Sequence, residues 1–171
     1  MRLVGGKISF FRSVWLAGLV AIPVVAGAAQ SAAADEVIVT VEHVLALDKI
    51  DLPTAGQADF YAQVTIDGRT VKSKFIRRAD EIRPNWVMPV RVRPGKHRVK
   101  LEILDHNVMM KPTLVDINRL PGKRDLDFEV DTRRCVVTGF AEEYKCSARI
   151  RRAGAERRRA EITFTVDVER R

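Results

Sequence analysis

Strict alternation of apolar and polar residues is the feature of this sequence that most limits its possible folds. Residues 161–168 alternate at every position, and residues 60–66 and 86–92 follow the same two-residue period. This period places apolar side chains on one face of a β-strand. No window of about eleven or more residues shows convincing helical periodicity, and residues 41–47 are the nearest ambiguity. We therefore expect an all-β protein.

Turn signals divide the alternating runs. Asp67-Gly68 and Pro94-Gly95 are tight-turn pairs, and each lies between two such runs. Two groups of arginine flank residues 153–155 and predict a basic hairpin tip before the last strand. Seven or eight short strands at this spacing predict a two-sheet antiparallel β-sandwich, and 171 residues suit one domain. The expected strands are residues 37–41, 60–66, 70–76, 86–92, 97–104, 125–130, 135–138 and 161–168.

The first 34 residues have the pattern of a signal peptide. Three basic residues and no acid precede Asp35, an apolar run covers residues 14–25, and three alanines end at Ala34. We expect cleavage after Ala34, with Ala29 as the alternative site. An uncleaved anchor is the competing interpretation, because a membrane-spanning helix needs about 20 apolar residues and this stretch reaches that length only with its glycines and alanines.

Export would leave a mature domain of residues 35–171 in the periplasm or cell envelope, or secreted. The segment holds three of the 30 basic residues and no acid, so its removal changes the net charge from +8 to +5. In an oxidising compartment Cys135 and Cys146 are expected to form a disulfide. Two free buried thiols are the alternative.

The order of features from residue 37 to about residue 116 resembles a C2 domain, the β-sandwich family that binds calcium and phospholipid. An acidic loop at residues 46–52 precedes Ala58-Asp59-Phe60-Tyr61, where the family has an Asp-Pro-Tyr step. A basic strand follows, then Arg83-Pro84-Asn85-Trp86, which is similar to the family's Asn-Pro-x-Trp turn. Residues 101–107 are similar to its Val-x-Asp-x-Asp strand end. The resemblance covers about eighty residues and implies a C2-like sandwich.

The resemblance also implies a calcium site, because the first and third loops of such a sandwich lie at one end. Calcium prefers six to eight oxygen ligands, and fewer fixed charges weaken its binding. Phe60 replaces the family's proline and an amide replaces one carboxylate, so we expect at most one weakly bound calcium ion. A calcium-free version stays open, since Asp and Asn also populate turns. The candidate ligands are Asp51 (or Asp48) and Asp59 from the first loop, Asp105 and Asn107 from the third, and Asp116 beyond it.

Basic residues with strand spacing predict a cationic sheet face, provided that their strands are neighbours. Such a face would attract phosphate or sulfate groups of an anionic phospholipid or polysaccharide surface. A solvated face without a ligand is the alternative. The residues are Lys72, Lys74, Arg91, Arg93, Lys96, Arg98 and Lys100.

Two loop segments carry apolar residues of the kind that membrane-binding members of the family insert into lipid headgroups. Packing in the core is the alternative, because apolar side chains gain by leaving water wherever they go. These residues are Ile50, Leu52 and Pro53 in the first segment and Val108, Met109 and Met110 in the second.

The sequence carries no signature of catalysis. Neither serine of the mature chain lies in a Gly-x-Ser-x-Gly elbow, and the three histidines lack metal-ligand spacing. Nucleic acid is not an expected partner, because aromatic residues are not interleaved with the basic ones. We expect an exported, non-enzymatic C2-like module that binds an anionic membrane or envelope surface, with a weak calcium site. A metal-free structural or protein-interaction sandwich of the cell envelope, with an envelope protein as partner, is the alternative.

Overall fold

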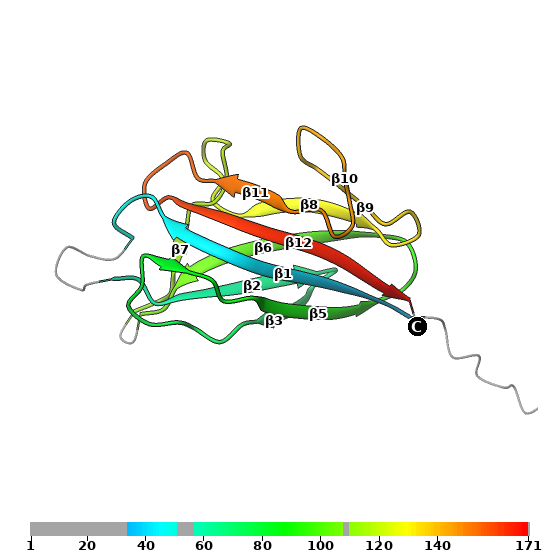
Figure 1. The fold of residues 1–171 in the computed structure, drawn as a ribbon, viewed down its shortest axis with the longest axis horizontal. Helices are drawn as coiled ribbons and strands as arrows, with labels where there is room; N and C mark the ends of the chain where they lie inside the picture. The colour runs from blue at the N-terminus through cyan, green and yellow to red at the C-terminus, as the bar shows by residue number, and fades with distance from the viewer. Residues whose placement is uncertain (1–33, 51–56, 108–109, 171) are drawn as a thin grey trace, which may run out of the picture. The chain divides into compact units, whose positions relative to one another are not determined.

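β-Strands form the fold in the part of the chain that the structure, a computed structural model, describes: residues 34–50, 57–107 and 110–170 (Figure 1). No helix in these ranges is long and apolar enough to cross a membrane. The strands are β1 (Asp35–Ala46), β2 (Phe60–Ile66), β3 (Arg69–Lys72), β4 (Glu81–Ile82), β5 (Trp86–Val92), β6 (Lys96–Asp105), β7 (Thr113–Val115), β8 (Leu126–Asp131), β9 (Val136–Thr138), β10 (Tyr144–Lys145), β11 (Ile150–Ala153) and β12 (Ala160–Arg170).

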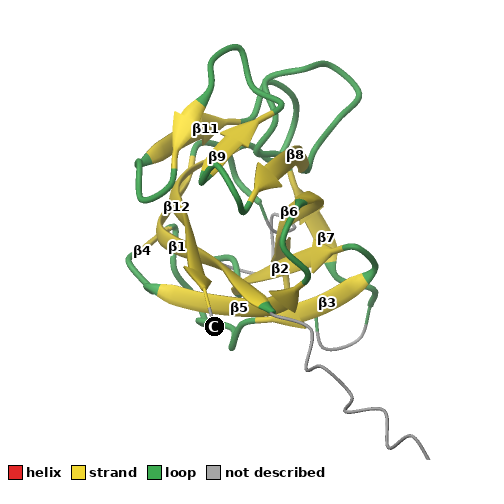
Figure 2. Ribbon diagram, turned by 90° about the vertical axis from the view of Figure 1, so that its right-hand side faces the viewer, coloured by secondary structure: helices red, strands yellow, loops and turns green. Residues whose placement is uncertain are grey.

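The strands pair into two antiparallel sheets that face each other (Figure 2). The first sheet has the order β11-β12-β1-β4, and β5 also pairs with β1. The second sheet has the order β10-β9-β8-β6-β2-β3, and β7 also pairs with β6. The predicted all-β, two-sheet antiparallel sandwich is therefore confirmed.

The core lies between the sheets and consists of the inward side chains of the alternating strands. In β1 every second residue from Val37 to Val41 is fully buried, and in β12 Ile162 and Phe164 are fully buried against them. Of residues 41–47, the nearest helical ambiguity of the sequence, all but Leu47 belong to β1, which has a register shift between Val41 and His43 and ends at Ala46. The alternation fixes which face of each strand is inside, because a shift of one residue would turn every apolar side chain outward.

The strand expected at residues 70–76 ends early, at Lys72, and the reason lies in Ser73. The Ser73 hydroxyl accepts a hydrogen bond from the backbone N–H of Ala62 at 2.9 Å. A side-chain oxygen thus takes a ladder position, as serine side chains commonly do where they compete with backbone acceptors. The N–H of Ser73 still donates to the carbonyl of Ala62 at 2.9 Å, and beyond it Ile76 forms an isolated bridge with Phe60.

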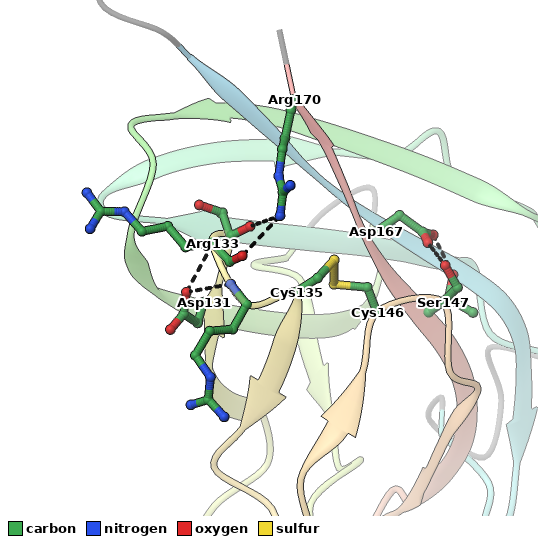
Figure 3. The surroundings of a disulfide bond; sticks show 10 residues. Asp131, Arg133, Cys135, Cys146, Ser147, Asp167 and Arg170 are labelled. Carbon is green, nitrogen blue, oxygen red and sulfur yellow. Dashed lines mark hydrogen bonds between the residues drawn. A yellow bond between two sulfur atoms is a disulfide. The ribbon is translucent and has the colours of Figure 1, made fainter.

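The disulfide predicted between Cys135 and Cys146 is present, with the two Cα atoms 5.3 Å apart (Figure 3). It closes the hairpin of β9 and β10 at its base, where the backbone N–H of Cys146 also donates to the carbonyl of Cys135. The hydroxyl of Ser147 donates to Asp167 of β12. The disulfide hairpin is therefore tied to the last strand. The basic hairpin predicted before that strand is also present, as β11 paired with β12.

Candidate functional site

Three connecting segments meet at one end of the sandwich, which we call the loop end. They follow β1, β3 and β6, and their described residues are 47–50 and 57–59, 73–80, and 106–107 with 110–112. The backbone N–H of His106 donates to the carbonyl of Asp59 at 2.8 Å, which joins the first and third segments. The N–H of Arg78 donates to Oδ1 of Asp59 at 2.9 Å, which joins the second. In Figure 1 this end lies opposite the C-terminus.

Asp59 and Asp105 lie side by side in the loop end. Oδ1 of Asp105 accepts a hydrogen bond from the backbone N–H of Asp59 at 2.8 Å. Asp105 is 1% exposed, whereas Asp59 is half-buried. Each carboxylate therefore gives one oxygen to a backbone N–H group, and this hydrogen bonding holds the two side chains in fixed positions. Asn107 lies near them, because its amide donates to the backbone oxygen of Asp105 at 3.4 Å.

The first-loop candidate Asp51 lies outside the described residues. Its alternate, Asp48, forms a two-pronged ion pair with Arg159, with Nη2 to Oδ1 at 2.8 Å and Nε to Oδ2 at 3.0 Å. The hydrogen bond from Arg159 holds the pKa of Asp48 below its usual value. Within the described ranges, no group of three or more His, Cys, Asp or Glu side chains could hold a metal ion.

Asp116 has a structural role. It is 0% exposed, and its carboxylate accepts three backbone hydrogen bonds, from Asn118 at 3.0 Å, Ala155 at 3.0 Å and Glu156 at 2.6 Å. Both oxygens are occupied, so Asp116 does not fit the role of calcium ligand suggested by the sequence. It holds the loop between β11 and β12 instead. This arrangement requires glycine at position 154, because a Cβ atom there would lie 2.2 Å from the backbone oxygen of Asp116.

Exposed apolar side chains project from the second and third segments. Phe75 is 39% exposed and Met110 is 59% exposed. The Phe75 ring stacks on His106 with centroids 4.7 Å apart, and the guanidinium of Arg77 lies 5.1 Å from the Phe75 centroid. Of the other apolar candidates, Ile50 is 3% exposed and belongs to the core. Leu52, Pro53, Val108 and Met109 lie outside the described residues.

Exposed cations lie in the same segments as these apolar side chains. Lys74, Arg77, Arg78 and Lys111 are all exposed, and none of them takes part in an ion pair found among the described residues. Lys74 was expected from its spacing along a strand; the other three were not, because they lie in connecting segments without strand periodicity. The signal that could have found them is the density of basic residues around one phenylalanine in residues 72–78.

The predicted basic row on β6 faces an acidic row on β8. Across the ladder, the positions of Lys96, Arg98 and Lys100 are paired in register with three acids. Lys96 lies 3.3 Å from Glu129, and Lys100 lies 2.6 Å from Asp125. The hydrogen bond that Lys100 donates to Asp125 raises the pKa of Lys100. This face therefore carries alternating charge rather than a cationic field. The three opposing acids are Asp131, Glu129 and Asp127.

The other predicted basic residues do not extend the β6 row. Lys72 lies on β3, the edge strand of the second sheet, which β2 separates from β6. Arg91 belongs to β5 in the first sheet, and its Nε lies 3.9 Å from Glu36. Arg93 follows the end of β5 and is exposed. The condition that these strands be neighbours thus holds in part: β3 and β5 contact each other, and Arg69 of β3 donates to the backbone oxygen of Arg91 at 2.8 Å, whereas β2 lies between β3 and β6.

Comparisons with known proteins identify the fold. No protein-family model matches the chain, and no curated protein sequence matches it. The chain is similar to a C2 domain of plant extended synaptotagmin 1, with a TM-score of 0.55, 14% identity, and coverage of 80% of this chain and 95% of that one. It is also similar to human GIVD cytosolic phospholipase A2, with a TM-score of 0.53 and 12% identity over 80% of this chain. It spans 17% of that phospholipase chain.

A calcium-bound structure of two C2 domains of extended synaptotagmin 2 is similar as well, with a TM-score of 0.51 and 12% identity. That match covers 78% of this chain and 45% of the other. These likenesses show that the all-β sandwich of this chain is C2-like.

Proposed function

We propose that this chain is an exported, non-enzymatic binding module that attaches to an anionic phospholipid surface through its loop end. One observation carries the proposal: exposed Phe75 and Met110 lie in the same segments as cations that have no carboxylate partner among the described residues. Near an anionic membrane each lysine or arginine is worth about 1 kcal/mol. Apolar side chains gain further by entering the boundary between headgroups and acyl chains. This combination favours a lipid surface over an anionic polysaccharide, which offers no apolar layer.

The C2-like fold supports the same choice of surface. Two of the similar structures are modules of extended synaptotagmins, and one similar protein is a phospholipase. The balanced charges on β6 and β8 argue against the sheet face as the main contact, because cations that face acids in register attract an anionic surface weakly.

The calcium part of the proposal is one weakly held ion at the loop end. Two carboxylates from different segments lie side by side there, those of Asp59 and Asp105, and each accepts a hydrogen bond from a backbone N–H. Asn107 would add a neutral oxygen. Calcium bound by these residues would supply positive charge at the loop end and bridge the carboxylates to lipid phosphates. The cations near Phe75 would provide the attraction that does not depend on calcium.

Vesicle sedimentation tests the membrane proposal directly. The mature protein should sediment with vesicles that contain phosphatidylserine, and to a much smaller extent with phosphatidylcholine vesicles. Charge reversal by Lys74→Glu with Arg77→Glu should weaken sedimentation with anionic vesicles at least tenfold, because two attractive charges become repulsive. Arg133→Glu with Lys145→Glu is the matched control, because these exposed residues lie in the disulfide hairpin region near β12.

Two results would contradict the proposal. The first is an absence of sedimentation with anionic vesicles in both the presence and the absence of calcium, which would favour the metal-free protein-interaction module. The second is an equal loss in the control variant, which would show that general charge rather than the loop end is responsible. Rising salt should weaken the binding of the unmutated protein, since ions screen exposed charges over about 8–10 Å.

The calcium part of the proposal has its own test. Millimolar calcium should raise the melting temperature of the unmutated protein, because a ligand that binds only the folded state stabilises it. Asp59→Asn and Asp105→Asn should each remove that rise. Both asparagines keep an oxygen that can accept the existing backbone hydrogen bond, so the variants should fold. Calorimetric titration without any heat at millimolar calcium would reject the ion and leave the membrane proposal to stand on the cations alone.

A further inference from the structure

We propose that the chain has a second ligand site, for a single-chain anionic amphiphile, in a cavity beside the disulfide hairpin. The cavity has a volume of about 380 Å³ and lies between the loop that precedes β8, the tip of the hairpin of β9 and β10, and Arg152 of β11. It lies outside the segment from residue 37 to about residue 116 on which the resemblance to C2 domains rests. Its size is within the range of small-molecule sites in proteins, about 300–1,000 Å³.

The cavity has an apolar wall that is continuous with the core. Leu126 is 3% exposed and Phe140 is partly buried, and both line the cavity. The Phe140 ring contacts two core rings, those of Phe128 and Phe164, at centroid distances of 5.4 and 6.4 Å. Leu120 is 56% exposed although it lines the same cavity. An apolar ligand chain between Leu120 and Phe140 would remove both side chains from water, and this burial would favour binding.

A fixed positive charge lies at the side of this apolar space. The guanidinium of Arg152 lies 4.3 Å from the Phe140 centroid and 5.3 Å from the Tyr144 centroid. It donates to the backbone oxygen of Arg151 at 2.7 Å and to the Tyr144 hydroxyl at 3.1 Å. No ion pair found in the described part of the chain includes Arg152. An arginine has five N–H groups, so others remain to bind an anion.

Arg119 adds a second cation at the same place. Arg119 and Arg152 line both this cavity and a neighbouring one, which Arg151 and Glu161 also line. Arg151 is paired with Glu161 at 2.7 Å, whereas Arg119 takes part in no ion pair found among the described residues. An anionic head between Arg119 and Arg152 would therefore meet two cations that no carboxylate of the described ranges neutralises, with its chain directed along Phe140.

The acids in the cavity lining are already engaged or face other groups. Glu142 accepts a hydrogen bond from the Tyr144 hydroxyl, and Asp127 is paired in register with Lys100 across the second sheet. Lys123, which also lines the cavity, adds another positive charge. The charges of the lining residues favour a ligand with an anionic head group over one with a cationic head group. The apolar wall favours an amphiphile over a free inorganic anion.

Calorimetric titration with decanoate and with decyl phosphate tests the proposal and distinguishes a carboxylate head from a phosphate head. Decanol supplies the chain without the charge, and acetate supplies the charge without the chain. At least one of the two anionic amphiphiles should bind saturably with one molecule per chain. Decanol should bind at least about tenfold more weakly, and acetate should give no measurable heat.

Two exposed substitutions probe the two halves of the site without disturbing the core. Leu120→Asp should weaken binding of the anionic amphiphile about tenfold or more, because it removes apolar contact and adds a repelling charge. Arg119→Gln should weaken it severalfold and reduce the preference over decanol. Val87→Asp on β5 and Arg157→Gln are the matched controls, because both residues are exposed and lie outside the cavity lining and the loop end. Both should bind like the unmutated protein.

The outcomes decide the proposal. Saturable binding of neither anionic amphiphile would overturn it, as would equal affinity for decanol. Loss of binding in Met110→Asp, a loop-end variant, with retention in Leu120→Asp would also overturn it, since it would assign the ligand to the loop end. Neither result decides the membrane proposal, because that proposal is tested separately, with vesicles and with variants of Lys74 and Arg77.

Discussion

At the scale of single residues, the buried carboxylate of Asp116 is the clearest example of a side chain that shapes backbone at a distance in sequence. Its Oδ2 atom accepts hydrogen bonds from N–H groups about forty positions later, and the backbone N–H of Ala160 donates to its carbonyl at 2.8 Å. A buried acid is stable only when it is fully hydrogen-bonded. The loop from 154 to 159 and Asp116 therefore depend on each other.

Replacement of Asp116 by alanine should lower the free energy of unfolding by about 3 kcal/mol, because backbone N–H groups that are buried would lose their charged acceptor. Urea unfolding followed by circular dichroism measures this change. Asp127→Ala, at an exposed acid, is the control and should stay within about 0.5 kcal/mol of the unmutated protein. An equally small change in Asp116→Ala would show that water replaces the carboxylate without cost.

The ion pair of Asp48 and Arg159 gives a pH dependence with a defined sign. The pKa of Asp48 is lowered in the folded protein by the hydrogen bond from Arg159. The stabilisation from this pair is therefore fully present above the ordinary aspartate pKa of about 3.9 and is lost as the pH falls through the lowered value.

Asp48→Asn should consequently melt at a lower temperature than the unmutated protein at pH 7, and the difference should close below about pH 3. The effect should be small, because both side chains are partly exposed and solvent screens the pair. Melting curves from about pH 2.5 to pH 7 measure it. A difference that stays constant across this range would contradict the assignment. The double variant with Arg159→Gln should add little to either single one.

At the scale of elements, the disulfide hairpin combines covalent closure with attachment to β12. The bond joins residues separated by 11 positions, a short loop for which the chain-entropy model gives about 3 kcal/mol. Reduction, or replacement of both cysteines by alanine, should lower the free energy of unfolding by about that amount. Urea unfolding with and without dithiothreitol measures it, and thiol labelling of the unfolded, unreduced protein should find no free cysteine. Two labelled thiols in protein from the native source would contradict the bond.

The sequence predicts the long elements well and the short ones poorly, for a physical reason. β1, β2, β5, β6 and β12 each bury one face, so their alternation is visible without knowledge of their partners. β4, β7 and β10 were not expected, because two or three residues carry no period and their pairing depends on distant strands. The arrangement of the predicted basic residues depends on strand order and was not predictable for the same reason. Strand order decides that β5 lies in the other sheet and that β8 supplies acids opposite β6.

The candidate sites could likewise be predicted from the sequence only in part. The meeting of Asp59 and Asp105 was predictable, since it follows from the order of loops that the resemblance implies. The burial of Asp116 was not, because it depends on the loop that begins at Gly154. The cavity at Phe140 also escaped prediction, since its lining comes from three segments whose contacts are set by the hairpin and by β11.

At the scale of the whole molecule, the expected end of the signal peptide coincides with the start of the first strand. The first strand begins at Asp35, which pairs with Arg170 on one side and Val92 on the other. Cleavage after Ala34 would place the new N-terminus at the first paired residue and leave no overhang. N-terminal sequencing of protein purified from the cell envelope should therefore start at Asp35. An intact Met1 on a membrane-embedded product would contradict cleavage and favour the anchor.

The adjacency of Asp35 and Arg170 also determines how the domain responds to mechanical load. Hydrogen bonds of an antiparallel pair lie perpendicular to the strands. A force that pulls the ends of β1 and β12 apart therefore acts along these bonds and loads them one pair at a time, beginning at Asp35 and Arg170. We expect single-molecule stretching from the two ends to unzip the first sheet at low force. Stretching between residues 35 and 157 should require a higher force, because it shears many bonds of the same strand pair together.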